Sequence, residues 1–366
     1  MEEITKRLVK WSRGEKAPPH KVLIYPTNRC NLKCPFCFQR LNPYDYLKDL
    51  SHDRWIELTE ELCRMGTDII QISGGGEPLT VPDTTLRMME IIKENGVNGR
   101  LVNNGTLWRQ DDIKKVIDME WNHVIFSVDG GTLEVNDKSR GVPGAFEKII
   151  KNIKFFNQEK AIAERESPRL EFSTVVSKFN FSHLGEIIEL AHGLGVSNIT
   201  FEPVFVSNPS VEELKVSKME RDFIIGKIGE WKALAESFDI STNLDDVFEV
   251  REIEKTGDLK GKIFEISKTE SEHPFLKIPC YEPWIWPKIE ADGRVGPCST
   301  ILLSDFCKKE VSVKNRSFED IWYGEKFESF RKYVINGYLT DSCANCVSTH
   351  LSWNSRIREE LRKVLS

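Results

Sequence analysis

The chain has 366 residues, of which 40% are hydrophobic and 30% are charged, a composition typical of a globular protein with room for more than one domain. The formal net charge is −6 and the basic residues are scattered, which argues against a nucleic-acid-binding surface. The amino terminus lacks an apolar segment and no apolar run reaches membrane-spanning length, so we expect neither a signal peptide nor a membrane anchor.

The chain in order predicts an α/β fold. Residues 1–21 form a polar lead-in, and short β-rich runs then alternate with amphipathic helical stretches as far as residue 203. The expected strands are residues 22–25, 69–73, 100–103, 123–128, 170–176 and 198–202, and the expected helices are residues 52–65, 83–95, 110–119, 144–159 and 183–194. This alternation indicates a parallel sheet. Six such units over residues 22–203 predict a partial (β/α)6 TIM-like barrel, with its chemistry at the carboxyl ends of the strands.

A loop directly after the first expected strand carries three cysteines within eight residues. Cys30, Cys34 and Cys37 have the spacing C-x3-C-x2-C, and thiolates are ligands for iron and zinc. Three thiolates on a four-iron cluster leave one iron open, as a reactive cluster requires, whereas a structural site is closed by a fourth ligand. The alternative is a zinc knuckle that takes its fourth ligand from a distant part of the chain.

The cysteine loop resembles the signature of the radical S-adenosylmethionine (SAM) enzymes, with aromatic Phe36 directly before the third cysteine. The resemblance implies a [4Fe-4S] cluster held by Cys30, Cys34 and Cys37, with SAM bound at the open iron. In that family the cluster passes an electron to SAM, which yields methionine and a 5′-deoxyadenosyl radical. That radical removes a hydrogen atom from the substrate.

Adjacent glycines and a glutamate follow the second expected strand. Glycines allow the backbone to approach a ligand closely, and a carboxylate accepts hydrogen bonds from an ammonium group. Gly75, Gly76 and Glu77 resemble the family's GGE motif, which implies that they bind the amino group of SAM. Asn104, in the stretch 103–106, is similar to part of the family's TNG stretch beside SAM. An ordinary Asn-Gly turn is the alternative there.

The end of the fourth expected strand resembles the family's S-x-D-G … R-G stretch. The resemblance implies that Ser127 contacts polar groups of SAM and that Arg140 pairs with its carboxylate, a task that suits the planar guanidinium group. Asp129 and Gly130 are expected to shape the turn. Glu202, at the end of the sixth expected strand, either faces the substrate or caps the rim of the barrel.

Residues 204–279 change character, because they are dense in charge and show no chemical motif. We expect a long amphipathic helix over residues 211–238 that closes the barrel, followed by a linker. A second cysteine-bearing domain is expected over residues 280–366.

Four cysteines of this last region form the second constellation: Cys280, Cys298, Cys343 and Cys346. Four soft ligands can close a metal site completely, so a structural zinc site is one interpretation. Behind a radical SAM core, the pattern resembles the SPASM/Twitch extension. This implies a small C-terminal domain with a helical tail and one auxiliary [4Fe-4S] cluster, because the seven cysteines of the full SPASM pattern are not present.

Two further cysteines have no expected metal. Cys63 falls on an amphipathic helix, and we interpret it as core packing. Cys307 lies between the expected auxiliary ligands. It is either a hydrogen-atom donor of the kind that radical epimerases use or a spare thiol in a loop.

These observations predict a radical SAM oxidoreductase. We expect it to be cytoplasmic, where the many cysteines of the chain would serve as metal ligands instead of forming disulfides. A cluster with four cysteine ligands has no open iron for the substrate, so electron transfer is its expected role. This favours oxidation of an alcohol carbon in a small polar molecule such as an aminocyclitol or a sugar, which also needs a proton acceptor. A flavodoxin or ferredoxin is the expected reducing partner. The alternatives are an epimerase, a peptide-modifying enzyme and, from another class, a non-catalytic metal-binding protein.

Overall fold

The computed structural model describes residues 1–41, 48–205, 209–248, 273–299, 311–338 and 348–365, together with residues 340, 343 and 346. Six strands of one sheet are parallel to one another and alternate with helices. The strands are β1 (Lys21–Ile24), β2 (Ile69–Ile72), β3 (Asn98–Asn103), β4 (His123–Ser127), β5 (Arg169–Val176) and β6 (Asn198–Pro203). The helices between them are α2 (Phe38–Leu41), α3 (His52–Arg64), η2 (Pro78–Thr80), α4 (Pro82–Glu94), α5 (Gln110–Asp118), α6 (Leu133–Arg140), α7 (Ala145–Ile162) and α8 (Leu184–Gly193).

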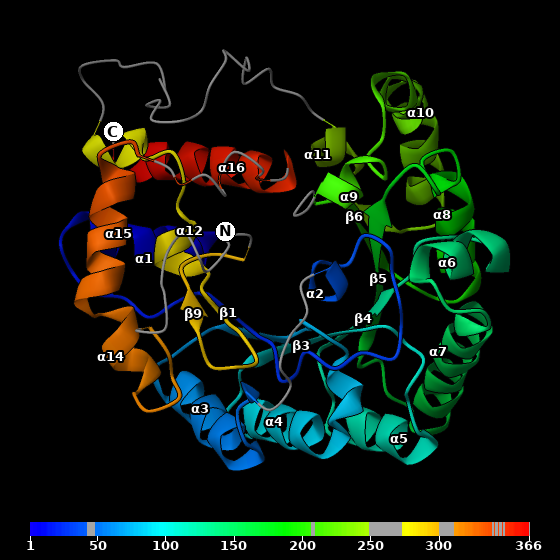
Figure 1. Ribbon diagram of the computed structural model, residues 1–366, viewed down its shortest axis with the longest axis horizontal. Helices are drawn as coiled ribbons and strands as arrows, with labels where there is room; N and C mark the ends of the chain where they lie inside the picture. Colours follow the sequence, from blue (N-terminus) through cyan, green and yellow to red (C-terminus); the bar gives the residue numbers. More distant parts are fainter. Residues whose placement is uncertain are drawn as a thin grey trace.

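Each of these strands pairs in parallel with the next one along the chain. Figure 1 shows the strands as an arc with α3, α4, α5, α7 and α8 around its outer side, so the sheet curves into part of a barrel. The predicted α/β fold with a parallel, barrel-like sheet is therefore confirmed. The predicted strands and helices of this region also match the observed ones to within a few residues.

The sheet continues at both edges with strands from later in the chain. β7 (Ser241–Thr242) pairs in parallel with β6, and β8 (Lys288–Ile289) pairs in parallel with β1. β9 (Val295–Gly296) pairs with β8 in the antiparallel direction. The full order is β7-β6-β5-β4-β3-β2-β1-β8-β9. Strand patterns in the sequence did not predict that residues beyond the barrel region extend its sheet.

The alternation of residues in β1 shows which face of the sheet is the outer one. Val22 and Ile24 are fully buried in the hydrophobic core that also contains Trp55 of α3. Because successive side chains of a strand point to opposite faces, Lys21 and Leu23 point to the inner face. A charged residue thus begins the first strand inside the barrel.

The prediction of one helix over residues 211–238 is wrong for its first turns. The structure instead has a short helix α9 (Pro209–Glu212) and a separate helix α10 (Lys218–Ser237). Ser217 ends the break, because its Oγ accepts a hydrogen bond from Glu220 N at 3.3 Å while Glu220 Oε2 accepts one from Ser217 N at 2.6 Å. This reciprocal capping box defines a helix start, and the helical spacing of the apolar residues alone did not reveal it.

The helices of the C-terminal region pack against the first helix of the chain. They are α11 (Leu244–Phe248), η3 (Pro274–Lys277), α12 (Glu282–Ile285), α14 (Phe318–Trp322), α15 (Glu325–Ile335) and α16 (Ser348–Leu365), and the first helix is α1 (Glu2–Ser12). Ile4 and Leu8 of α1 share a second hydrophobic cluster with Tyr281, Ile357 and Leu361. The lead-in segment is therefore packed into the C-terminal part of the molecule.

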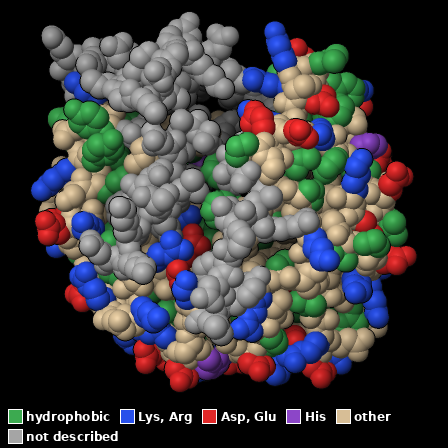
Figure 2. Space-filling model, viewed as in Figure 1, with side chains coloured by type: hydrophobic (Ala, Val, Ile, Leu, Met, Phe, Trp, Pro, Cys, Tyr) green, Lys and Arg blue, Asp and Glu red, His purple; other side chains and the backbone are tan. Residues whose placement is uncertain are grey.

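The described surface carries charges of both signs. Lys and Arg side chains are interspersed with Asp and Glu over the face shown in Figure 2. None of the described helices combines the length and the hydropathy that crossing a bilayer requires.

Arg331 of α15 contacts residues of the first helix, α1, and of the C-terminal helices α12 and α14. The side chain is 3% exposed, and its guanidinium carbon lies 4.4 Å and 4.2 Å from the ring centroids of Trp11 and Trp322. Arg331 Nε donates to Pro283 O at 3.0 Å and Nη1 donates to Trp322 O at 2.9 Å. Trp322 Nε1 in turn donates to Ala17 O at 2.9 Å. Burial lowers the pKa of Arg331 to about 9, so the contacts must offset its desolvation.

Replacing Arg331 by Ala should destabilise the protein by about 3 kcal/mol, because it removes the cation–π contacts with Trp11, Trp322 and Phe327 and leaves two buried carbonyls without their donor. We expect the apparent midpoint of thermal unfolding to fall by several degrees in scanning calorimetry. The matched variant Lys332→Ala changes an exposed neighbour on the same helix and should leave the midpoint unchanged. Equal midpoints for the two variants would contradict an anchoring role for Arg331.

Candidate active site

The cysteine loop leaves the carboxyl end of β1. Cys30 is exposed, whereas Cys34 and Cys37 are half-buried. Partial desolvation of its sulfur raises the pKa of Cys30, burial raises that of Cys34 to about 11, and the charge of the nearby Cys37 adds to both shifts. Leu32 N donates a hydrogen bond to Cys30 Sγ at 3.4 Å. Three soft donors lie close together here, although no three His, Cys, Asp or Glu side chains in the described part of the chain converge on a single-ion site.

The glycine loop after β2 packs directly against the cysteine loop. Gly76 N donates to Thr27 O at 2.9 Å. A Cβ on Gly75 would lie 1.7 Å from Asn28 Oδ1, and a Cβ on Gly76 would lie 2.1 Å from Arg29 O. Only glycine permits this approach, so the two residues shape the cluster loop, whatever contact they make with a ligand.

Glu77 joins the ends of β2 and β3 beneath this loop. Its carboxylate is 2% exposed and accepts hydrogen bonds from Leu79 N at 3.0 Å and from Asn104 N at 2.6 Å. Asn104 Nδ2 donates to Asn31 Oδ1 in the cysteine loop at 2.8 Å. Burial raises the pKa of Glu77 to about 7. Each carboxylate oxygen keeps a further lone pair that an ammonium group can use.

Arg140 forms a buried ion pair that the sequence did not reveal. Its Nη2 lies 2.8 Å from Oδ1 of Asp129, a fully buried residue for which only a turn role was expected. Lys33 N donates to Arg140 O at 3.1 Å, and the guanidinium lies against the Cys34 sulfur and opposes the rise of its pKa. Among the described residues, Arg140 Nε is buried without a hydrogen-bond partner. A carboxylate, as SAM carries, would satisfy this donor.

Ser127 completes the set of residues expected around SAM. It is half-buried, ends β4, and lies opposite Ser173 in the register of β5. The predicted residues therefore follow the ends of β2, β3 and β4 around the cysteine loop. Three soft thiols, a carboxylate and a free guanidinium donor fit a cluster and the amino and carboxylate groups of SAM.

The C-terminal cysteines lie beside the mouth of the barrel. Burial raises the pKa of Cys280 well above its usual value, and the charges of Glu282, Cys298 and Cys346 add to this rise, so these thiols lie near one another. Glu290 and Cys298 likewise add to the effect of burial on Tyr25, whose pKa is raised at the end of β1. Cys298 of the second set thus lies near the end of the strand that leads into the first set.

Within the second set, Cys346 N donates a hydrogen bond to Cys343 O at 3.1 Å. Two cysteines lie outside both sets. Cys63, in the last turn of α3, is buried in the core, as predicted. Cys307 lies outside the described residues.

Charged side chains of the barrel interior were missed at the sequence level, apart from Glu202. Lys21 Nζ lies 3.9 Å from the ring centroid of Trp286, and burial lowers its pKa to about 7. His350 of α16 stacks on Trp286 with ring centroids 5.7 Å apart, and its Nδ1 lies 3.7 Å from Glu282 Oε1. Burial lowers the pKa of His350 to about 4 and raises that of Glu282 to about 8.

A second group of charged side chains lies on β3, β4 and β5, near enough to Lys21 for Arg100 and Glu171 to affect the pKa of Lys21. Arg100 Nη2 is 2.8 Å from Glu171 Oε2, and His123 Nδ1 contacts the other oxygen of Glu171. The signal that could have found these residues is a charge at a strand position that faces inward.

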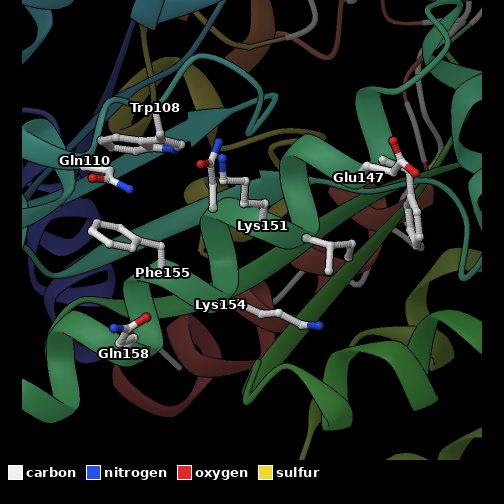
Figure 3. A pocket seen from close by; sticks show the side chains of 10 residues that line it. Trp108, Gln110, Glu147, Lys151, Lys154, Phe155 and Gln158 are labelled. Atoms are coloured by element: carbon white, nitrogen blue, oxygen red, sulfur yellow. The ribbon is translucent and has the colours of Figure 1, made fainter.

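A groove of about 640 Å³ lies elsewhere, among the helices outside the sheet. Figure 3 shows Trp108 and Gln110 on one side of it and side chains of α7, including Lys151 and Phe155, on the other. It does not include the cysteines or the interior charges, so it is separate from the candidate site.

Two family models match the chain at the regions that this geometry singles out. Residues 24–191 match the radical SAM superfamily, and residues 280–347 match the SPASM iron-sulfur cluster-binding domain. The chain is a radical SAM enzyme with a SPASM domain. Its cofactors are SAM and two iron-sulfur clusters, as the cysteine sets predict.

Relatives of this radical SAM enzyme differ in what their names say they do. The AdoMet-dependent heme synthase of Methanosarcina barkeri is 25% identical over 327 residues, which cover 87% of this chain and 86% of the relative. The PqqA peptide cyclase of Rhodopseudomonas palustris is 25% identical over 340 residues, which cover 90% of this chain and 79% of the relative.

Solved structures show the same fold. Streptococcus suis SuiB bound to S-adenosylmethionine has a TM-score of 0.66 at 15% identity, and the match covers 94% of this chain and 75% of the SuiB chain. anSMEcpe with bound AdoMet and a Cp18Cys peptide has a TM-score of 0.63 at 16% identity, and the match covers 94% of this chain and 97% of the anSMEcpe chain.

Replacing Cys30, Cys34 and Cys37 together by Ala should abolish reductive cleavage of SAM and leave the C-terminal cluster bound, because only the three-cysteine set leaves an iron open. After anaerobic reconstitution, we expect about eight iron atoms per chain in the wild type and about four in the variant. The matched variant Cys63→Ala should keep the full iron content. Release of 5′-deoxyadenosine by the triple variant under dithionite would refute this assignment of the reactive cluster.

Glu77→Ala and Arg140→Ala should each weaken SAM binding by about 1.5–3 kcal/mol, since each removes a charge-assisted hydrogen bond in a buried place. Titration calorimetry on the reconstituted enzyme measures this directly. Glu134→Ala, at an exposed position of α6, is the control and should bind SAM normally. Normal affinity in both site variants would show that these residues do not contact SAM.

Proposed function

We propose that this radical SAM enzyme oxidises an alcohol carbon of a small polar substrate, such as an aminocyclitol or a sugar, in the barrel interior. The observation that carries the proposal is the place of the second cysteine set. Cys298 and Cys346 raise the pKa of Cys280, and Cys298 also raises that of Tyr25 at the end of β1. An electron acceptor held there is close to a substrate in the mouth of the barrel, as oxidation requires.

In this proposal, each group of residues in the site has its own role. Cys30, Cys34 and Cys37 hold the reactive cluster, and Glu77 and Arg140 bind the amino and carboxylate groups of SAM. When bound, these groups supply a 5′-deoxyadenosyl radical. The second set of cysteines holds the auxiliary cluster, and a flavodoxin or ferredoxin is the proposed source of electrons.

The interior charges favour a substrate that makes hydrogen bonds. Glu282 is buried and Lys21 and His350 are half-buried around Trp286, and desolvation is the main cause of their shifted pKa values. Hydroxyl and amino groups can pair with such side chains, whereas an apolar substrate would leave them without partners.

A peptide is the second candidate substrate. The observation that favours it lies in the relatives, which include a PqqA peptide cyclase, and in the likeness to SuiB, a structure of which contains its precursor peptide SuiA. A peptide side chain or backbone in the same interior would meet the same radical and the same electron acceptor.

The substrate class can be tested with reconstituted enzyme, SAM and dithionite. Streptamine and glucosamine represent the small polar class, and a synthetic peptide encoded beside the gene represents the other. We expect 5′-deoxyadenosine above the background without substrate, together with a product that is lighter by two hydrogen atoms. Turnover of the peptide alone would overturn the small-molecule proposal.

Oxidation and epimerisation can be separated through Cys307. An epimerase must return a hydrogen atom to the substrate radical, and a thiol donates one readily, whereas an oxidation has no use for it. Cys307→Ala should therefore leave turnover nearly intact. In deuterated water, a product that has lost no hydrogen atoms overall, but carries deuterium in place of hydrogen at the attacked carbon, would show epimerisation instead.

A further inference from the structure

Glu202 lies inside the barrel at its catalytic end. In β6, Ile199 and Phe201 are fully buried in the core under the outer helices. The two-residue period of a strand therefore places Thr200 and Glu202 on the inner face. Glu202 is also the residue before the end of the strand at Pro203, and in parallel barrels the carboxyl ends of the strands carry the chemistry.

A residue from the C-terminal helix holds this carboxylate. Thr349, which is 8% exposed near the start of α16, donates its Oγ1 hydrogen to Glu202 Oε2 at 2.7 Å. Figure 1 shows that this end of α16 reaches toward α11 and β6. The other oxygen of Glu202, Oε1, makes no hydrogen bond within the part of the chain that the structure describes. One oxygen is thus held and the other is left for a ligand.

The groups that face Glu202 come from three other elements. Asp246 of α11 opposes ionisation of the carboxyl group, but it is itself paired with Arg356 of α16, whose Nη1 lies 2.7 Å and 2.8 Å from the two carboxylate oxygens. Lys21 of β1 and the hydroxyl of Thr349 favour ionisation. Burial outweighs them and raises the pKa of Glu202 to about 7. A carboxylate near its pKa at neutral pH can both accept and release a proton.

We propose that Glu202 is the proton acceptor of the oxidation and that Thr349 is a positioning residue for its carboxylate. The proposal rests on the proposed function. After the substrate carbon has lost a hydrogen atom, its hydroxyl O–H bond breaks and the proton passes to Glu202 Oε1. The carbon–oxygen double bond forms as the remaining unpaired electron is lost, and the auxiliary cluster that Cys280, Cys298, Cys343 and Cys346 would hold would accept that electron. The same carboxylate would accept an N–H proton from an amine-bearing carbon.

A purely structural role makes different predictions. If Glu202 only ties α16 to the barrel, Glu202→Gln should be harmless, because the amide oxygen still accepts the hydrogen bond from Thr349. Thr349→Val should then be the damaging change. If Glu202 is the proton acceptor, the order is reversed.

The first test needs no substrate. Infrared difference spectra of the cluster-loaded enzyme across the pH range, wild type minus Glu202→Gln, isolate the carbonyl band of the protonated Glu202 side chain. We expect half-protonation near neutral pH, and we expect Thr349→Val to move it to higher pH, because the lost donor favoured the ionised form. A Glu202 that stays ionised at mildly acidic pH, or a titration that Thr349→Val leaves unmoved, would overturn the proposal.

The second test uses whichever of streptamine, glucosamine or peptide the wild-type enzyme consumes. Glu202→Gln should lower oxidised product by about 100-fold or more while 5′-deoxyadenosine still forms, because hydrogen abstraction precedes proton transfer. Thr349→Val should keep the maximal rate and shift the acid limb of the pH profile upward. Full product formation by Glu202→Gln would refute the role. If the wild type oxidises none of the three compounds, the proposed function fails, and the infrared titration still decides the state of Glu202.

Discussion

Two backbone hydrogen bonds hold the candidate site together. Gly76 N donates to Thr27 O at 2.9 Å and Glu77 N donates to Arg29 O at 2.7 Å, so the loop after β2 is bound edge to edge to the cysteine loop. These bonds form only because no side chain separates the two backbones at Gly75 and Gly76. The orientation of the cysteines depends on this contact, and Glu77 extends it to the end of β3.

The site is assembled from loops but supported by rigid strands. Asp129, at the end of β4, holds Arg140, and Arg140 O accepts a hydrogen bond from Lys33 in the cysteine loop. The loop is therefore tied to the ends of three neighbouring strands of one sheet. Positions that must be accurate for electron and hydrogen transfer are usually held in this way, by residues whose own partners are buried.

Much of this arrangement follows from short-range patterns. The two-residue and helical periods place the strands and helices of the barrel, and the spacing of Cys30, Cys34 and Cys37 after a strand indicates a reactive cluster. The family resemblance adds Glu77 and Arg140 at the next strand ends. Each of these signals is a short local motif or period, which is why it can be read without a structure.

Contacts between distant residues account for most of what could not be predicted, and one missed feature, the break before α10, is local. Thr349 and Glu202 are 147 residues apart, and no local pattern joins them. In the sequence alone, Lys21 looks like any other charged residue, because its neighbours come from the distant segments at β8 and α16. The break before α10 depends on a capping box in which Ser217 and Glu220 satisfy each other's backbone, a local signal that the apolar periodicity outweighed.

The pairing of β8 with β1 makes the strand that bears the cysteine loop an interior strand. Leu23 and Ile24 of β1 lie in register with Lys288 and Ile289 of β8, so β1 has a partner on each side. Removing the C-terminal region would expose the backbone of β1 as an edge strand, which readily pairs with other chains and promotes aggregation. Chimeras that exchange the auxiliary-cluster domain between relatives therefore need to preserve this two-residue register as well as the cysteines.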